Sequence, residues 1–239
     1  MRVIPAIDII DGKCVRLTQG NYAAKKVYND DPLKVAKEFE AAGLKYLHLV
    51  DLDGAKAGKV TNWSVVETIC TATTLIVDFG GGIKTEEELK KLFDAGVNQV
   101  NLGSLAVKNP DVVQEWIKKY GADKIILSAD VKNEKIAVGG WIENSAVHIT
   151  DFISQYVDKH IEYITCTDIS TDGMLQGPNI QLYQLLLDTF PSIKLIASGG
   201  VSSFEDLEQL EKTNVNAVIV GKAIYEGRIT LDELASFNH

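Results

Sequence analysis

The chain has 239 residues, of which 46% are hydrophobic, and its 24 Lys and Arg against 33 Asp and Glu give a net charge of −9. This length allows one α/β barrel or two smaller domains, with a core large enough to need no disulfide or metal. The negative charge, which no basic run offsets, argues against nucleic acid or an anionic membrane as a partner.

The sequence also limits where the protein is expected to work. No apolar run approaches the roughly 18 residues of a membrane helix, and the N-terminus has no signal-peptide pattern. Cys14, Cys70 and Cys166 are scattered without metal-ligand spacing, which predicts reduced thiols. We therefore predict a cytoplasmic protein with no membrane segment. The lack of a basic patch or an apolar surface stretch favours a monomer.

Eight short runs rich in Val, Ile and Leu predict buried parallel strands. Amphipathic patterns between them, several with clear N-terminal capping signals, predict helices that cover the sheet. Eight such repeats in this length fit a single-domain (β/α)8 TIM barrel over residues 1–239 better than a doubly wound sheet. In chain order the predicted strands are residues 3–7, 46–52, 75–78, 99–102, 125–130, 163–167, 194–197 and 217–220, and helices are expected at 32–42, 85–95, 111–120, 180–189 and 203–212.

Two extra segments interrupt this alternation. Residues 13–17 and 135–138 follow turns after the first and fifth predicted strands. They resemble short β-excursions above the C-terminal mouth, where barrel enzymes carry their function. Arg16 and Trp141 lie on these excursions and could close over a ligand, although an exposed arginine is usually only a solvated charge.

Part of the sequence repeats itself half a chain later. A constant offset of 118 carries Gly81 to Gly199, Gly82 to Gly200 and Gly103 to Gly221, and each copy reads as strand, glycine turn, helix, strand and second glycine. The duplication predicts two half-barrels, about 1–120 and 121–239. A single glycine turn is often only a tight connection, but paired turns at strand-to-helix junctions favour phosphate binding by backbone N–H groups. The predicted sites are Gly81, Gly82, Gly103 and Ser104 for one phosphate and Gly199, Gly200 and Gly221 for the other, which indicates a bis-phosphorylated small molecule.

Two aspartates stand at the ends of opposite strands. Asp8 ends the first predicted strand and Asp130 ends the fifth, so their carboxyl groups should face each other across the mouth, between the two phosphate sites. Paired carboxyl groups in a partly dry cavity can act as one general base and one general acid. The alternative is that each caps a helix or closes a buried ion pair.

Other polar residues fall near the same mouth. Thr167, at the end of the sixth strand, could support a catalytic carboxyl group or be structural, and His48 is either a satisfied interior histidine or a substrate contact. The loop after the sixth strand and its half-barrel counterpart add further binding candidates, which are Asp51, Asp172, Gly173 and Gly177.

Several motifs together resemble the ProFAR isomerase family of histidine biosynthesis, over residues 1 to about 227. The motifs are Pro-Ala-Ile-Asp at 5–8, Asp-Gly-Lys-Cys-Val-Arg-Leu at 11–17 with Gln-Gly at 19–20, His-Leu-Val-Asp-Leu-Asp-Gly-Ala at 48–55, Gly-Gly-Gly-Ile at 80–83, Thr-Asp-Ile at 167–169 with Asp-Gly at 172–173, and Ser-Gly-Gly-Val at 198–201. The resemblance implies a barrel of two duplicated halves that converts a bis-phosphorylated aminoimidazole carboxamide ribotide from aminoaldose to aminoketose. This Amadori rearrangement needs no metal or organic cofactor.

The resemblance also implies roles for particular residues. Asp130 would be the general acid that opens the ribose ring and Asp8 the general base that removes the C2 proton, with Thr167 in support. Arg16, Gly20 and Trp141 match the loops that clamp the substrate. Lys84 stands where some relatives carry arginine after the glycine turn, which puts a bidentate contact there in doubt.

Related alternatives stay open at this point. The sister cyclase of the same pathway resembles this chain but carries lysine where this chain has Arg16. The tryptophan-pathway isomerase is similar too, but it carries a cysteine base where this chain has Asp8. A dual-substrate isomerase would keep both aspartates. A non-catalytic phosphometabolite-binding barrel would keep both glycine turns without needing Asp8 and Asp130 together.

Overall fold

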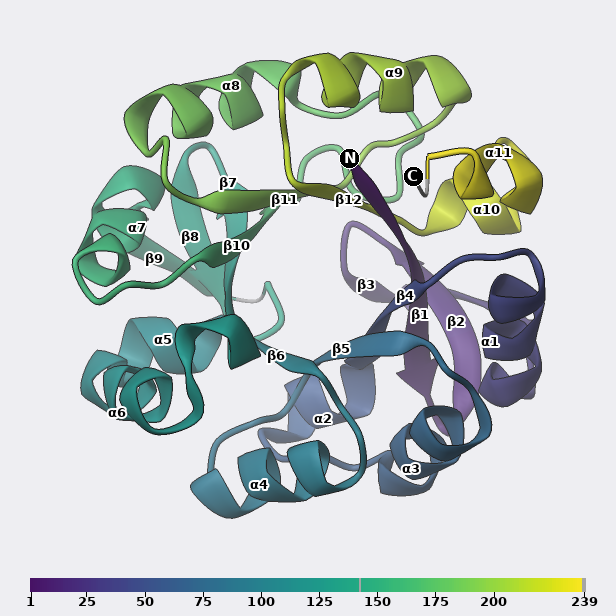
Figure 1. Ribbon diagram of the computed structural model, residues 1–239, viewed down its shortest axis with the longest axis horizontal. Coiled ribbons are helices and arrows are strands. Elements are labelled where there is room, and N and C mark those ends of the chain that lie inside the picture. Colours follow the sequence, from purple (N-terminus) through teal and green to yellow (C-terminus); the bar gives the residue numbers. More distant parts are fainter. Residues whose placement is uncertain (142, 238–239) are drawn as a thin grey trace.

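The computed structural model describes residues 1–141 and 143–237, and its centre is a closed barrel of eight parallel strands (Figure 1). The first barrel strand pairs in parallel with the last, which closes the ring. The predicted (β/α)8 barrel is therefore confirmed. In order around the ring the strands are β1 (Arg2–Ile10), β4 (Tyr46–Asp51), β5 (Ile76–Gly80), β6 (Gln99–Leu102), β7 (Ile125–Lys132), β10 (Tyr163–Asp168), β11 (Lys194–Ser198) and β12 (Ala217–Val220).

Helices surround the barrel, and the helix predicted at residues 85–95 begins with a capping box. The Thr85 side chain accepts a hydrogen bond from the backbone N–H of Glu88, whose side chain bonds back to Thr85. This reciprocal capping box starts the predicted helix. Among the described residues no helix is both long and apolar enough to cross a membrane. The helices are α1 (Pro32–Ala41), α2 (Leu52–Ala57), α3 (Trp63–Ala72), α4 (Glu86–Asp94), α5 (Ser104–Lys108), α6 (Pro110–Tyr120), the 3-10 turn η1 (Ala122–Lys124), α7 (Ile149–Val157), α8 (Ile180–Thr189), α9 (Phe204–Lys212), α10 (Lys222–Tyr225) and α11 (Leu231–Ala235).

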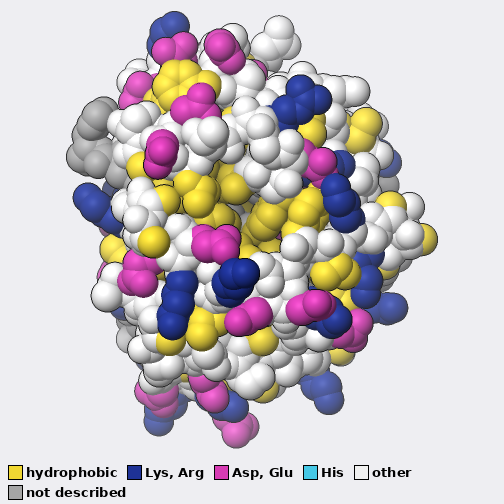
Figure 2. All heavy atoms as spheres, turned by 90° about the vertical axis from the view of Figure 1, so that its right-hand side faces the viewer, with side chains coloured by type: hydrophobic (Ala, Val, Ile, Leu, Met, Phe, Trp, Pro, Cys, Tyr) yellow, Lys and Arg dark blue, Asp and Glu magenta, His cyan; other side chains and the backbone are white. Residues whose placement is uncertain are grey.

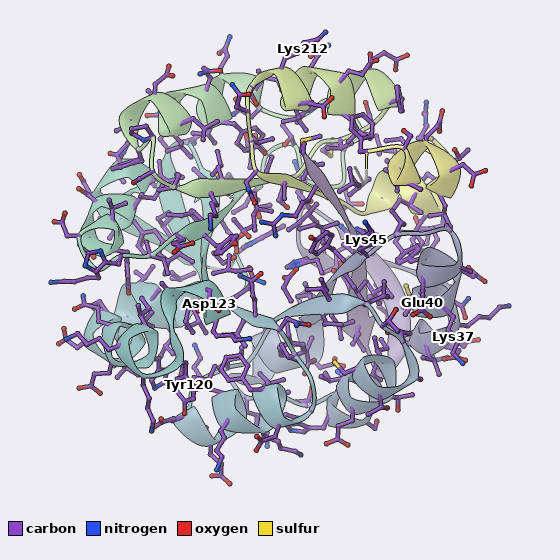
Figure 3. The ribbon with its side chains drawn as sticks, in the orientation of Figure 1. Lys37, Glu40, Lys45, Tyr120, Asp123 and Lys212 are labelled. Carbon is purple, nitrogen blue, oxygen red and sulfur yellow. The ribbon has the colours of Figure 1, made fainter. Side chains whose placement is uncertain are left out.

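Side chains alternate along each barrel strand between the helix layer and the barrel interior. On β4, Leu47 and Leu49 belong to the main core beneath the helices, whereas His48 faces the interior cavity. Part of the interior is a separate apolar cluster made of Ile4, Ala6, Ile126, Ile196, Ala217 and Ile219. Figure 3 shows side chains filling the barrel, while Lys212 and Lys37 project outward from the helices.

The surface carries charges of both signs. On the face shown in Figure 2, Lys and Arg are interspersed with Asp and Glu, and no broad basic area is visible. The exposed positions of the helices are rich in charged residues, and the apolar helix faces pack against the core.

Each predicted β-excursion is one arm of a full hairpin. β2 (Lys13–Thr18) pairs with β1 and with β3 (Asn21–Asn29), and β8 (Lys135–Val138) pairs with β7 and with β9 (Glu143–His148). This arrangement corrects the predicted strand ends. β1 runs two residues past Asp8 and β7 two residues past Asp130, because each strand continues from the barrel into its hairpin. The two aspartates therefore lie where a strand leaves the barrel rather than at its end.

Candidate active site

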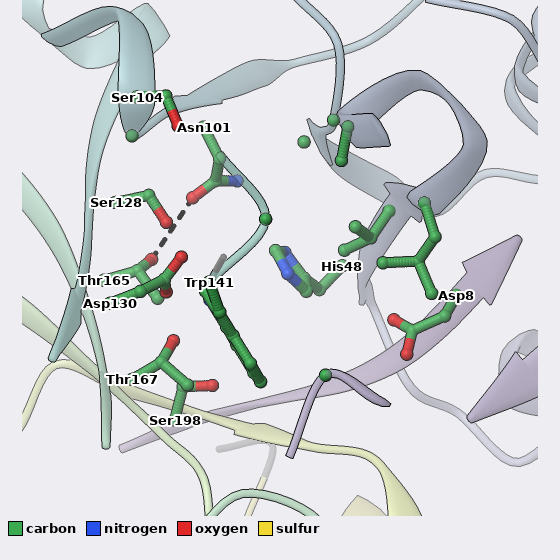
Figure 4. A pocket seen from close by; sticks show the side chains of 18 of the residues that line it. Asp8, His48, Asn101, Ser104, Ser128, Asp130, Trp141, Thr165, Thr167 and Ser198 are labelled. Carbon is green, nitrogen blue, oxygen red and sulfur yellow. Dashed lines mark hydrogen bonds between the residues drawn. The ribbon is translucent and has the colours of Figure 1, made fainter. Parts of the chain in front are cut away.

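A cavity of about 220 Å³ lies at the carboxyl ends of the barrel strands (Figure 4). Every barrel strand, or the turn that follows it, contributes a residue to its wall. Both hairpins also reach it. Twelve of the residues predicted from the sequence line this cavity: Asp8, Arg16, Gly20, His48, Gly81, Gly82, Gly103, Ser104, Asp130, Trp141, Thr167 and Asp172.

Asp8 lies on one wall of the cavity and is paired with a cation. Its Oδ2 is 3.0 Å from Nη1 of Arg16, and both side chains are largely buried. Burial raises the pKa of the Asp8 carboxyl, while the positive charges of Arg16 and His48 partly oppose the rise. The buried ion pair considered as an alternative is thus present, and the same carboxyl group also faces the cavity.

Asp130 lies on the opposite wall, because three barrel strands separate β7 from β1 in either direction around the ring. Burial raises the pKa of its carboxyl group as well, and hydrogen bonds from Trp141 and Thr167 act against the rise. Thr167 is the register partner of Asp130 on the neighbouring strand. Within residues 1–141 and 143–237 no arginine pairs with this carboxyl group as Arg16 does with Asp8, so the two acids occupy chemically different surroundings.

The first predicted phosphate site forms one end of the cavity. Gly81 and Gly82 have φ of +103° and +85°, and a Cβ atom at either would overlap backbone atoms of Asp51 or Lys59. Only glycine fits these positions. The turn leaves Lys84 in the cavity wall, where burial and the nearby charge of Lys108 lower the pKa of its ammonium group.

The second predicted phosphate site forms a separate small cavity of about 20 Å³, lined by Gly173, Gly199, Gly200, Gly221 and Lys222 among others. The Arg16 guanidinium packs directly on Gly221 and leaves no room for a Cβ atom there. Lys222 donates hydrogen bonds to the Gly173 carbonyl at 2.7 Å and the Thr18 hydroxyl at 3.2 Å. Two cations and a glycine turn thus share this small space.

Two of the predicted binding residues, Asp51 and Gly177, lie outside both cavities and make hydrogen bonds within the protein. Asp51 is fully buried and lies outside both cavities, and its carboxylate accepts hydrogen bonds from the backbone N–H groups of Gly54, Thr61 and Asn62. These bonds hold the loop after β4, and a direct substrate contact by Asp51 stays a prediction. Gly177 likewise lies outside both cavities, and its N–H donates to the Gly200 carbonyl at 3.0 Å.

Sequence reasoning missed a line of polar residues inside the barrel. Oδ1 of Asp78 lies 2.5 Å from Nδ1 of His48 and also accepts a hydrogen bond from Asn101. The Thr165 hydroxyl donates to Oδ1 of Asn101 at 3.3 Å. Burial opposes the charged form of His48, but Asp78 and Asp8 leave its pKa raised. The missed signal is polar residues at inward positions of otherwise apolar strands.

Comparison with known proteins identifies relatives along almost the whole chain. The sequence profile described as "Histidine biosynthesis protein" matches residues 2–230. A Flavobacterium psychrophilum protein named 1-(5-phosphoribosyl)-5-((5-phosphoribosylamino)methylideneamino) imidazole-4-carboxamide isomerase, or ProFAR isomerase, is 55% identical over 237 residues, which are 99% of this chain and 98% of that protein.

Proteins of the same name occur among other relatives. The one from Parabacteroides distasonis is 56% identical and the one from Cytophaga hutchinsonii 54% identical, and each comparison covers at least 99% of both sequences. The profile match and these full-length similarities agree with the motifs quoted above. The chain therefore belongs to the histidine biosynthesis protein family, among its ProFAR isomerases.

Proposed function

We propose that the protein converts ProFAR to its ribulosyl isomer by an Amadori rearrangement in histidine biosynthesis. The relatives that share its full length are named as isomerases of this phosphoribosylated compound. The observation that supports the chemistry is the pair of buried carboxyl groups, Asp8 and Asp130, on opposite walls of one cavity between two glycine cradles. The sister cyclase and the dual-substrate isomerase are not favoured by these similarities.

The proposed reaction begins at Asp130. Its raised pKa favours the protonated form, which donates a proton to the ribose ring oxygen while the C1–O bond breaks and a Schiff base forms. Asp8, held beside the Arg16 cation, then removes the proton on C2 to give an enolamine. The enolamine becomes the ketone by gaining a proton at C1 and losing one from the C2 hydroxyl. Proton transfers account for every step, so the proposal needs no metal or organic cofactor.

The proposed binding mode stretches the substrate between the two glycine cradles. Backbone N–H groups near Gly81, Gly82, Gly103 and Ser104 would receive one phosphate, and those near Gly199, Gly200 and Gly221 the other. Trp141, which bonds to Asp130, and Gly20, against which it packs, would cover the reacting ribose. Asp172 and Gly173 would close the far end, because the Asp172 carbonyl accepts a hydrogen bond from the Gln19 N–H and Gly173 lies against Leu17 of β2.

Replacing each carboxyl group tests the acid–base roles. We expect Asp8→Asn and Asp130→Asn each to reduce kcat by roughly 10²–10⁴-fold, while the affinity for ProFAR, measured by calorimetry, changes little. Asp94→Asn, at an exposed position of α4, is the matched control and should leave kcat unchanged. Full turnover by either active-site variant would show that the assignment is wrong.

The substrate itself is tested by offering alternatives to the wild-type protein. Turnover of ProFAR is expected in an assay that also offers phosphoribosyl anthranilate and, separately, the ketose product with ammonia. Activity only on phosphoribosyl anthranilate, or ammonia-dependent cyclisation of the ketose, would contradict the proposal.

We further propose that the enzyme works as a cytoplasmic monomer built from half-barrels 1–120 and 121–239. Light scattering measures the molecular mass in solution, and the mass of a dimer would exclude the proposed monomer.

A further inference from the structure

A line of hydrogen-bonded polar side chains crosses the barrel interior beneath the proposed reaction site. It begins at His48 on β4, passes through Asp78 on β5 and Asn101 on β6, and ends at Thr165 on β10. Asp78, Asn101 and Thr165 are 7%, 8% and 2% exposed. We call these four residues the interior polar chain. The Amadori steps assigned to Asp8 and Asp130 do not use it.

The interior polar chain needs an explanation beyond packing. Buried polar groups cost free energy unless each is hydrogen-bonded, and apolar side chains fill most barrel interiors more simply. The opposite part of this interior does so with Ile4, Ile196 and Ile219. Thr165 donates a hydrogen bond to Asn101, Asn101 donates one to Asp78, and Asp78 in turn fixes His48. The interior polar chain thus leads to His48, whose imidazole lines the cavity.

The hydrogen-bond pattern determines how the imidazole is presented. A carboxylate can only accept hydrogen bonds, so the bond to Oδ1 of Asp78 comes from an Nδ1–H group of His48. When the imidazole is neutral, Nε2 therefore carries a lone pair. Figure 4 shows the His48 ring projecting between Asp8 and Asp130. The positive charge of the protonated imidazole lowers the pKa of both carboxyl groups, against the larger effect of burial, which raises each pKa.

We propose that His48, oriented by the interior polar chain, accepts the proton of the C2 hydroxyl when the enolamine becomes the ketone. This inference rests on the proposed isomerase function. The O–H electron pair becomes the second bond of the C2 carbonyl, and the electron pair of the C1–C2 double bond takes up at C1 the proton that Asp8 had removed from C2. His48 then returns its proton to the ionised Asp130. Both aspartates are reset, and substrate and product remain isomers.

The first test follows the imidazole itself and requires no substrate. The nitrogen chemical shifts of His48, assigned by comparison with His48→Gln, report its tautomer and its titration. We expect an Nδ1–H tautomer in the neutral form, and in Asp78→Asn a lower pKa of His48, because the carboxylate that stabilises the imidazolium is gone. The ring nitrogen signals of His148, which contacts Glu134 at 3.1 Å outside the cavity, are the internal reference and should be the same in both proteins. An unmoved His48 titration, or an Nε2–H tautomer, would overturn the proposal.

The second test separates proton transfer from a merely structural role. His48→Gln should lower kcat on ProFAR by roughly 10²-fold, with a much smaller change in KM. Only a neutral imidazole can accept a proton, so the wild-type kcat should fall at low pH as His48 becomes protonated. His48→Gln should remove this acidic limb of the pH profile of kcat. In Asp78→Asn that limb should move to lower pH, in step with the pKa measured by NMR. His148→Gln, the matched control, should keep both kcat and the limb.

The outcomes distinguish this inference from the proposed function. Wild-type kcat together with an unchanged acidic limb in folded His48→Gln would overturn the role of His48 and leave the isomerase function standing. A wild-type protein that binds ProFAR without turning it over would overturn the proposed function and, with it, the proton step of His48. In that case the NMR titration would still decide whether Asp78 orients the imidazole.

Discussion

At the scale of single residues, the ionised carboxyl group of Asp172 at the mouth of the barrel makes the folded state less stable. Its carboxyl group lines both cavities. Burial raises its pKa from the ordinary 3.8 to about 6, although Arg16 attracts the ionised form. A carboxyl group whose pKa is higher in the folded than in the unfolded protein makes the folded state less stable as pH rises. The cost is absent below about pH 4, grows between pH 4 and 6, and is complete above pH 6.

Asp172→Asn should therefore stabilise the protein in a pH-dependent way. We expect the free energy of unfolding at pH 8 to rise by at most roughly 3 kcal/mol, which corresponds to the difference between 3.8 and about 6. At pH 4 the substitution should have almost no effect. Urea denaturation at both pH values measures the change, with the exposed Asp94→Asn as control. An equal effect at the two pH values would contradict this account.

At the scale of elements, the two hairpins meet above the cavity. Gly20, at the turn between β2 and β3, lies so close to Trp141 that a Cβ atom there would be 2.5 Å from Cε3 of the indole ring. Trp141 comes from the other hairpin and hydrogen-bonds to Asp130. A contact at the tip of the first hairpin thus supports the carboxyl group at the base of the second.

Gly20→Ala should separate the hairpins and weaken the bond between Trp141 and Asp130. We expect kcat/KM for ProFAR to fall by roughly 10-fold or more, since this equals the loss of about 1.4 kcal/mol, and Trp141 fluorescence to change. Gly12→Ala is a matched control, because Gly12 has nearly the same φ, +72° against +69°, and no atom within 4 Å of its added methyl group. Equal losses in the two variants would mean that backbone strain alone is responsible.

The sequence predicts the barrel strands well and the hairpins only in part. Residues 46–52 and 217–220 were recognisable because buried parallel strands are nearly continuous apolar runs. β3 was missed because most of its residues are exposed and show no hydrophobic alternation. β9 lacks a long apolar run in the same way. Strands that pair above the barrel bury little, so hydrophobic periodicity does not mark them.

The candidate site was likewise predictable only where a local sequence pattern marks it. Asp8 and Asp130 could be found because each follows an apolar strand run, and the glycine turns because they repeat. Asp78 could not, since its partner His48 lies 30 residues away and their contact depends on the register of β4 with β5. The hydrogen bonds of Asp51 could not be predicted for a related reason. Its role depends on a loop, residues 54–62, that folds back to hydrogen-bond it.

At the scale of the whole molecule, closure of the ring depends on β12. Residues Arg2 to Pro5 of β1 pair with Ala217 to Val220. A chain that ends after residue 216 should therefore leave one edge of β1 unpaired and lose cooperative unfolding, whereas a chain that ends after residue 230 keeps the pairing. Hydrogen exchange of the β1 amides measures the difference. Full protection in the shorter chain would show that closure by β12 is dispensable.

The pairing of β1 with β12 also has a consequence for synthesis on the ribosome. The first strand of the barrel must wait for the eighth, and contacts between such distant segments carry a large entropic cost and form slowly. During that wait β1 presents an unpaired apolar edge, Val3 to Ile7, which is a template for aggregation. The nascent barrel thus keeps this apolar edge open until β12 has been synthesised.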